Sequence, residues 1–158
     1  MLTRRRHVPG VTPTDVWGCL ADGWAYPTFV VGASSMRAVD PGWPADGAVL
    51  HHSVGAWPLL IQDTTSVVSA DPPRRLELQA RGWPAGEARV VFELAEQDDG
   101  TLVSLSEDAT NGPGVLLPRP LRHLLMAPRN DATLERLAHL VRGRVGAGDP
   151  PGSVPSGE

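Results

Sequence analysis

Residues 75–109, RLELQARGWPAGEARVVFELAEQDDGTLVSLSEDA, decide the fold of this chain. Apolar Leu76 and Leu78 are separated by a single polar residue, which is the spacing of a β-strand with one buried face. The alternation is equally clear at Val103 and Leu105 in the last segment. The turn-forming groups WPAG and EQDDG join the segments. Short connections between consecutive strands require antiparallel neighbours, so the stretch predicts a meander.

The strand pattern continues toward the N-terminus. VVGASSMRAV, AVLHHSVG and LLIQDTTSVVS are further strand candidates, again separated by turn residues. Six consecutive strands are therefore expected between residues 30 and 109. Residues 2–8 can form a seventh strand ahead of them.

Two short helices are expected between the first strand and the meander. Thr12 can serve as an N-cap, with Asp15 three residues later as its capping-box partner. Asp22 can cap a second helix, which runs through Phe29 and is interrupted near Pro27.

The last structured segment, VLLPRPLRHLLMAPRNDATLERLAHLVRG, predicts a long helix that is irregular up to Pro120 and can kink at Pro128. A sheet with one apolar face needs a cover, and this helix is the long amphipathic element that the sequence offers. Its apolar residues near helical spacing are Leu121, Leu125, Leu134, Leu137 and Val141.

Composition limits the classes of function. The 158 residues predict one domain at 1–145 and a disordered Pro/Gly/Ser-rich tail at 146–158. Net charge is -4, and all 14 basic residues are arginines. Apart from Arg4 to Arg6 they are scattered along the chain, which argues against a nucleic-acid-binding face. A single cysteine excludes an intrachain disulfide. The chain lacks an apolar run of roughly 18 residues and a signal-peptide pattern, so we expect a cytoplasmic monomer or homodimer without membrane insertion.

Three segments carry a resemblance to a known superfamily: PTDVWGCLADGWAYPTFV in the helical pair, GTLVSLSEDA in the last strand and APRNDATLERLAHLV in the terminal helix. The chain resembles the START-like (SRPBCC) superfamily with the helix-grip fold, in its bacterial polyketide cyclase/dehydrase-like group. The resemblance implies an α+β fold in which a curved, seven-stranded antiparallel sheet wraps the long C-terminal helix. It also implies a hydrophobic cavity between sheet and helix that takes lipids, polyketides or other apolar molecules.

Two Trp-Pro turns are expected at the same end of the sheet, because successive turns of a meander alternate ends. One contains Trp57 and Pro58, and the other contains Trp83. An indole on a proline-stiffened turn can cover an apolar opening, and the resemblance implies gate-like loops here. The alternative is that both tryptophans cap the end of the core.

Strand alternation also selects polar residues that face inward. Val103 and Leu105 continue to Glu107, while Leu50 and Val54 select His52 rather than His51. Adjacent strand residues point to opposite faces, so His51 and His52 cannot chelate one metal ion. On the next strand the same reasoning selects Asp63 and Thr65.

Glu107 and His52 are the candidates for acid–base catalysis, with Asp63 and Thr65 beside them in the pocket. Arg129 and Asn130 are expected on the cavity wall or rim. In the competing interpretation Glu107 forms a structural ion pair with Arg129 or another arginine, His52 is a satisfied interior group, and Asp63 is solvated or bonds a turn.

Three hypotheses on function remain open. The first is a binding module for a hydrophobic or amphipathic small molecule. The second is a polyketide cyclase or aromatase-dehydratase that needs neither metal nor cofactor. The third is a protein-interaction subunit without a ligand. The pocket is expected to be built from Phe92, Leu94, Val103, Leu105, Leu121 and Leu125, with Trp57 and Trp83 at its mouth.

Overall fold

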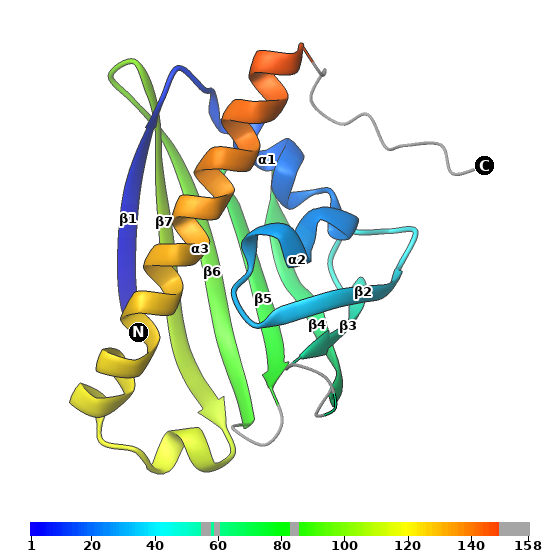
Figure 1. Ribbon diagram of the computed structural model, residues 1–158, viewed down its shortest axis with the longest axis vertical. Coiled ribbons are helices and arrows are strands. Elements are labelled where there is room, and N and C mark those ends of the chain that lie inside the picture. Colours follow the sequence, from blue (N-terminus) through cyan, green and yellow to red (C-terminus); the bar gives the residue numbers. More distant parts are fainter. Residues whose placement is uncertain (55–57, 59–60, 83–85, 149–158) are drawn as a thin grey trace.

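The computed structural model of the chain describes residues 1–54, 58, 61–82 and 86–148. Within this part, seven strands form one antiparallel sheet in the order β1-β7-β6-β5-β4-β3-β2 (Figure 1). From β2 to β7, strands that follow one another along the chain are paired, which confirms the predicted meander. The strands are Leu2–Pro9 (β1), Ala33–Val39 (β2), Val49–Val54 (β3), Ile61–Asp71 (β4), Arg75–Gly82 (β5), Gly86–Gln97 (β6) and Gly100–Asn111 (β7).

The first helix, Pro13–Leu20 (α1), begins at the predicted capping box. The Thr12 hydroxyl accepts a hydrogen bond from the backbone N–H of Asp15 at 3.2 Å. In return the Asp15 carboxylate accepts one from the backbone N–H of Thr12 at 2.7 Å. Two otherwise unpaired backbone donors are satisfied, which fixes the start of the helix after β1.

The second predicted helix is split in two. Asp22 accepts a hydrogen bond from the backbone N–H of Trp24 and caps a 3₁₀ turn, Gly23–Ala25 (η1). A single α-helical turn, Tyr26–Phe29 (α2), follows directly, so the change of helix type comes just before Pro27. Proline at the first positions of a helix loses no hydrogen bond, which explains why the second piece starts there.

A short 3₁₀ helix, Pro113–Leu116 (η2), leads into the long helix Arg119–Ala147 (α3). This helix runs through Pro128 and ends at Gly148, whose φ of 73° is the left-handed conformation of a C-terminal cap. The sequence predicts that the tail starts at residue 146, whereas the helix includes Gly146 and Ala147. The helix is therefore ended by Gly148 and not by Gly146.

The core lies between the sheet and the helices. In Figure 1, α3 crosses one face of the sheet, and α1 and α2 lie beside it on the same face. The buried residues of α3 lie between Asn130 and Val141, whereas Leu121, Leu124 and Leu125 of its first turns are exposed. None of the helices in the described part has the length and apolar character needed to cross a membrane. The largest fully buried apolar side chains are Phe29, Phe92, Leu50, Leu76, Leu78, Leu137, Val8, Val16, Val103 and Val141.

Candidate functional site

Two neighbouring hollows lie between the sheet and α3. The larger, which we call the outer hollow, has a volume of about 320 Å³. The smaller, the inner hollow, has a volume of about 60 Å³ and lies against α2. Small residues on β5, β6 and β7 make room for the outer hollow, and apolar side chains from α3 and from the residue that follows η2 face them across it. Its lining includes Ala80, Gly82, Gly86, Ala88 and Ala109 on the sheet side and Leu117, Leu125 and Met126 on the helix side.

An ion pair lies where the two hollows meet. Arg129 of α3 donates a hydrogen bond to the carboxylate of Glu107 on β7, and both residues line both hollows. Glu107 is 5% exposed, and the Arg129 side chain is 44% exposed. The carboxylate is therefore desolvated and held by a cation that water can still reach. The interpretation of Glu107 as the partner of Arg129 agrees with this geometry.

The inner hollow combines an apolar wall with one unsatisfied polar group. Phe92 and Leu105 of the sheet and Tyr26 of α2 form part of its wall. Asn130 of α3 also lines it and is only 2% exposed, yet its side-chain N–H₂ has no hydrogen-bond partner among the described residues. Leaving a buried N–H₂ group without a hydrogen-bond acceptor costs free energy. A ligand atom or a water that accepts its hydrogen bond would therefore be bound favourably.

A second polar cluster lies behind Tyr26. Nε2 of His52 lies 2.9 Å from the Thr65 hydroxyl, and the ring of Tyr26 stacks on the imidazole. Asp63 is the cross-strand neighbour of His52, and its carboxylate accepts a hydrogen bond from the backbone N–H of Thr64 at 2.8 Å. Nδ1 of His52 is buried and has no partner in the part of the chain that the structure describes.

Burial sets the protonation of this cluster. It lowers the pKa of His52 below the usual value of 6.5, and the negative charge of Asp63 opposes the change only in part. Burial also raises the pKa of Tyr26. His52 is therefore a neutral imidazole near neutral pH, with one ring nitrogen bonded to Thr65 and the other free to act as a donor or an acceptor.

The structure brings together some of the predicted site residues and separates others. Glu107, Arg129, Asn130, Phe92, Leu105 and Leu125 line one hollow or both. His52, Asp63 and Thr65 are buried on the same face of the sheet, but they line neither of these two hollows, because Tyr26 lies between. Of the three residues that the sequence predicts in one chamber, only Glu107 lines these two hollows.

Several residues that the sequence predicts in the pocket wall do not line the two hollows. Leu94 and Val103 are 5% and 1% exposed members of the packed core, and they line neither hollow. Leu121 is 42% exposed and also lines neither, because the first turns of α3 are not packed on the core. Pro58 is exposed, whereas Trp57 and Trp83 lie outside the described residues.

Tyr26 and Thr133 were not predicted from the sequence. The Thr133 hydroxyl accepts a hydrogen bond from the backbone N–H of Val31, so it ties α3 to the chain after α2. A signal for Thr133 existed in its position four residues before the apolar Leu137, which places both on one face of the helix. Tyr26, the only tyrosine, has no comparable periodic signal.

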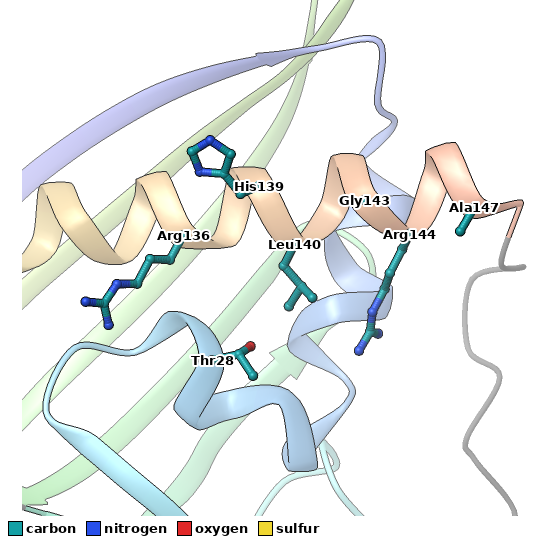
Figure 2. Close-up of a pocket in the computed structure, with 7 residues that line it drawn as sticks. All are labelled: Thr28, Arg136, His139, Leu140, Gly143, Arg144 and Ala147. Atoms are coloured by element: carbon teal, nitrogen blue, oxygen red, sulfur yellow. The ribbon is translucent and has the colours of Figure 1, made fainter.

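A third hollow, of about 540 Å³, lies further along α3, between its C-terminal part and α2 (Figure 2). Thr28 of α2 forms one wall, and the other residues shown in Figure 2 all belong to α3. Its Arg144 is held by Asp22 at 2.5 Å, and His139 contacts the backbone carbonyl of Glu135 at 2.9 Å. This hollow lacks the desolvated polar groups of the first two. The described residues contain no cluster of three or more His, Cys, Asp or Glu that could hold a metal ion.

Comparison with solved structures supports the same architecture. A protein from Nitrosomonas europaea is similar over 92% of this chain and 96% of its own, with a TM-score of 0.70 and 18% identity. Ara h 8.0201 matches with a TM-score of 0.68 and 13% identity, over 90% of this chain and 97% of its own. The di-domain ARO/CYC StfQ from the steffimycin biosynthetic pathway matches with a TM-score of 0.70 and 10% identity, over 92% of this chain and 51% of its own.

These identities are low, so the structural matches establish the fold alone. No curated protein matches the chain. The family described as polyketide cyclase / dehydrase and lipid transport matches residues 2–142, which is nearly all of the part that the structure describes. The chain therefore belongs to the polyketide cyclase / dehydrase and lipid transport family.

Proposed function

We propose that this domain binds one amphipathic, mostly apolar small molecule, with its body in the outer hollow and its polar end at the Glu107–Arg129 pair. The observation that carries the proposal is the position of this pair, on the shared wall of an apolar hollow and a more polar one. Ligand pockets usually combine an apolar lining with a few such polar groups. The outer hollow, at about 320 Å³, is near the lower end of the usual range for small-molecule sites.

The polar groups define the chemistry of the ligand end. Arg129 and Asn130 can only donate through their side-chain nitrogens, and the Glu107 carboxylate can only accept when ionised. A carbonyl oxygen fits the donors, and a neighbouring hydroxyl fits the carboxylate. A keto or hydroxyl group on an apolar skeleton therefore satisfies this set best, and the Asn130 amide would gain the partner that it lacks in the protein alone.

The test is a titration with two fluorescent amphipathic probes, cis-parinaric acid and 1-anilinonaphthalene-8-sulfonate. Ala109→Leu adds volume on the wall of the outer hollow and is expected to weaken binding at least about tenfold, since an overfilled site costs on the order of 1–3 kcal/mol. Ala95→Leu makes the same change at an exposed position of the neighbouring strand and is the matched control.

Saturable binding with one site, weakened by Ala109→Leu and unchanged by Ala95→Leu, supports the proposal. Absence of saturable binding for both probes, or equal effects of the two variants, overturns it. Native mass spectrometry of the freshly purified protein adds an independent measurement, because a retained ligand would appear as an added mass that Ala109→Leu reduces.

A second candidate function is cyclisation and dehydration of a poly-ketone. Two findings favour it: His52 is neutral with an unpartnered Nδ1, and the similar StfQ is an ARO/CYC protein. In an aldol step a C–C bond forms between a carbonyl carbon and an enolised carbon, and the following dehydration releases one water. A base must take the proton from carbon, and an acid must protonate the leaving oxygen.

The two functions are separated by incubating a synthetic poly-β-ketone thioester with the wild type and with Glu107→Gln. Conversion by the wild type that Glu107→Gln loses while it still binds the thioester would establish the enzyme. Binding without conversion by either protein would leave the binding module as the function. Mass spectrometry detects each lost water as a mass decrease in the product.

A further inference from the structure

Exposed apolar side chains gather on η2 and on the first turns of α3. We call Val115, Leu116, Leu117, Leu121, Leu124 and Leu125 the apolar tip; they are 38% to 85% exposed. Within the described part only four other large apolar residues are exposed, and they lie on other elements or at the far end of α3. Single exposed apolar residues are normal, but six within eleven residues of chain form a patch of the kind that marks an interaction surface.

The same segment is basic, although the protein is acidic. Residues 112–130 contain three arginines and His123 but no aspartate or glutamate, while the whole chain has a net charge of -4. Arg119 is exposed between the two leucine groups of the tip. Arg122 and Arg129 are held by Asp108 and Glu107 of β7. The tip therefore presents leucines together with unneutralised positive charge.

The position of the tip connects it to the candidate site. In Figure 1, η2 and the start of α3 project at one end of the molecule, beyond the body of the sheet. Leu117 and Leu125 of the tip also line the outer hollow, so the tip borders this hollow. Leu116 and Leu124 are 85% and 70% exposed and line neither hollow.

We propose that the apolar tip docks the protein on the surface of a lipid bilayer that contains anionic lipids. Helical segments with leucines on one side and arginines beside them lie in the bilayer interface, where the leucines enter the acyl boundary and the arginines meet anionic headgroups. Such docking needs no membrane-spanning helix, and none is found in the described part.

Two other occupants fit the observations less well. A symmetric contact between two copies through the tip would bring Arg119 close to its own copy, which is unfavourable, and would cover the border of the outer hollow. An acidic protein would match the charge but would leave most of the leucines to be explained. A bilayer satisfies both features, and it would place the outer hollow next to the lipid phase. This last consequence rests on the proposed function, whereas docking itself does not.

The experiment is co-sedimentation of the full chain with vesicles of phosphatidylcholine alone or with about 30% phosphatidylglycerol. The wild type is expected to bind the anionic vesicles more tightly, and added salt is expected to weaken this preference. Leu116→Ser/Leu124→Ser should weaken binding to both vesicles at least about tenfold, because two leucines no longer enter the acyl region. Arg119→Gln should weaken binding to the anionic vesicles only.

The matched control is Val68→Ser/Val145→Ser, which removes two apolar residues, each 41% exposed, outside the tip. Vesicle binding that this control retains supports the proposal. No vesicle binding by the wild type, equal loss in the control, or a wild-type dimer that Leu116→Ser/Leu124→Ser converts to a monomer in light scattering overturns it. A titration of Leu116→Ser/Leu124→Ser with cis-parinaric acid, without vesicles, tests the small-molecule site separately from membrane docking. Probe binding should equal that of the wild type, since these residues do not line the hollows.

Discussion

The ring of Tyr26 stacks on the imidazole of His52, with ring centroids 5.7 Å apart and planes inclined by 23°. Tyr26 lines the inner hollow, whereas His52 lies behind it. A ligand that reaches the inner hollow therefore meets the tyrosine before it meets the histidine. Proton exchange between His52 and a ligand in this hollow would require Tyr26 to move, while binding at Glu107 and Arg129 requires no such change.

The stability of the protein is expected to depend on pH through His52. Burial lowers the pKa of His52 in the folded protein, so the unfolded chain takes up a proton at this residue more readily. The contribution of neutral His52 to the free energy of unfolding should therefore be fully present above about pH 6.5. The free energy of unfolding should fall as the pH is lowered below this value. Urea unfolding at a series of pH values measures this slope.

His52→Gln removes the titrating group and should flatten the slope, whereas His51→Gln, on the opposite face of the strand, serves as the matched control. Should His52→Gln fail to fold, an NMR titration of the wild type still decides the question. An imidazole of His52 that titrates at or above the usual value would show the prediction to be wrong.

The Glu107–Arg129 pair is expected to show strong coupling in a double-mutant cycle. Arg129→Met leaves a buried carboxylate without its cation and should lower the free energy of unfolding by about 1–3 kcal/mol. The cost should stay below that of breaking a fully buried pair, because the arginine side chain is half-exposed and water can enter where it lies. Adding Glu107→Gln should recover much of the loss. Chemical denaturation of the single and double variants gives the coupling energy.

Arg81→Met is the control for this cycle. Its partner is Glu87 at 3.1 Å, and the two side chains are 63% and 30% exposed, so the change should stay within about 0.5 kcal/mol. Equal costs of Arg81→Met and Arg129→Met would mean that the Glu107–Arg129 pair behaves as an ordinary surface contact.

The single thiol is expected to be protected in the folded protein. Cys19 is 1% exposed, and burial raises its pKa to about 11. The reactive thiolate is therefore scarce near pH 8, and reagents cannot approach it. Ellman's reagent should react with the folded protein at least about a hundredfold more slowly than with the protein in concentrated urea, since reaction requires opening of the core. Similar rates in both states would show that the packing around α1 is loose.

The fold followed from the sequence because local patterns and topology agree. Alternation at Leu76, Leu78, Val103 and Leu105 fixes both the strands and the face that each one buries, and the short turns leave only antiparallel neighbours. The same alternation places Glu107 on the buried face, where the structure has it. Periodicity is sufficient where one residue type repeats on one face of an element.

The position of Tyr26 between His52 and the inner hollow did not follow from the sequence. Whether His52 and Glu107 share a chamber depends on where α2 rests on the sheet, and a single helical turn has too few residues to show this by spacing. Leu121 has helical spacing like Leu134, but spacing does not tell where the helix leaves the core. Such features depend on distances of an ångström or two between elements that are distant in the sequence.

Two glycines are expected to respond to alanine in opposite directions. A Cβ on Gly100, at the start of β7, would lie 2.2 Å from the carbonyl oxygen of Val8 and 2.7 Å from Cα of Pro9 on β1. These are backbone atoms that a rotamer change cannot move, so Gly100→Ala should destabilise the protein by about 1–3 kcal/mol. Gly143 lies at an exposed position near the C-terminal end of α3, with nothing within 4 Å of an added Cβ. Gly143→Ala should therefore stabilise the helix by about 0.5–1 kcal/mol. Thermal unfolding of both variants tests this; a stability for Gly100→Ala equal to the wild type would mean that the edge of β1 yields and is not firmly paired with β7.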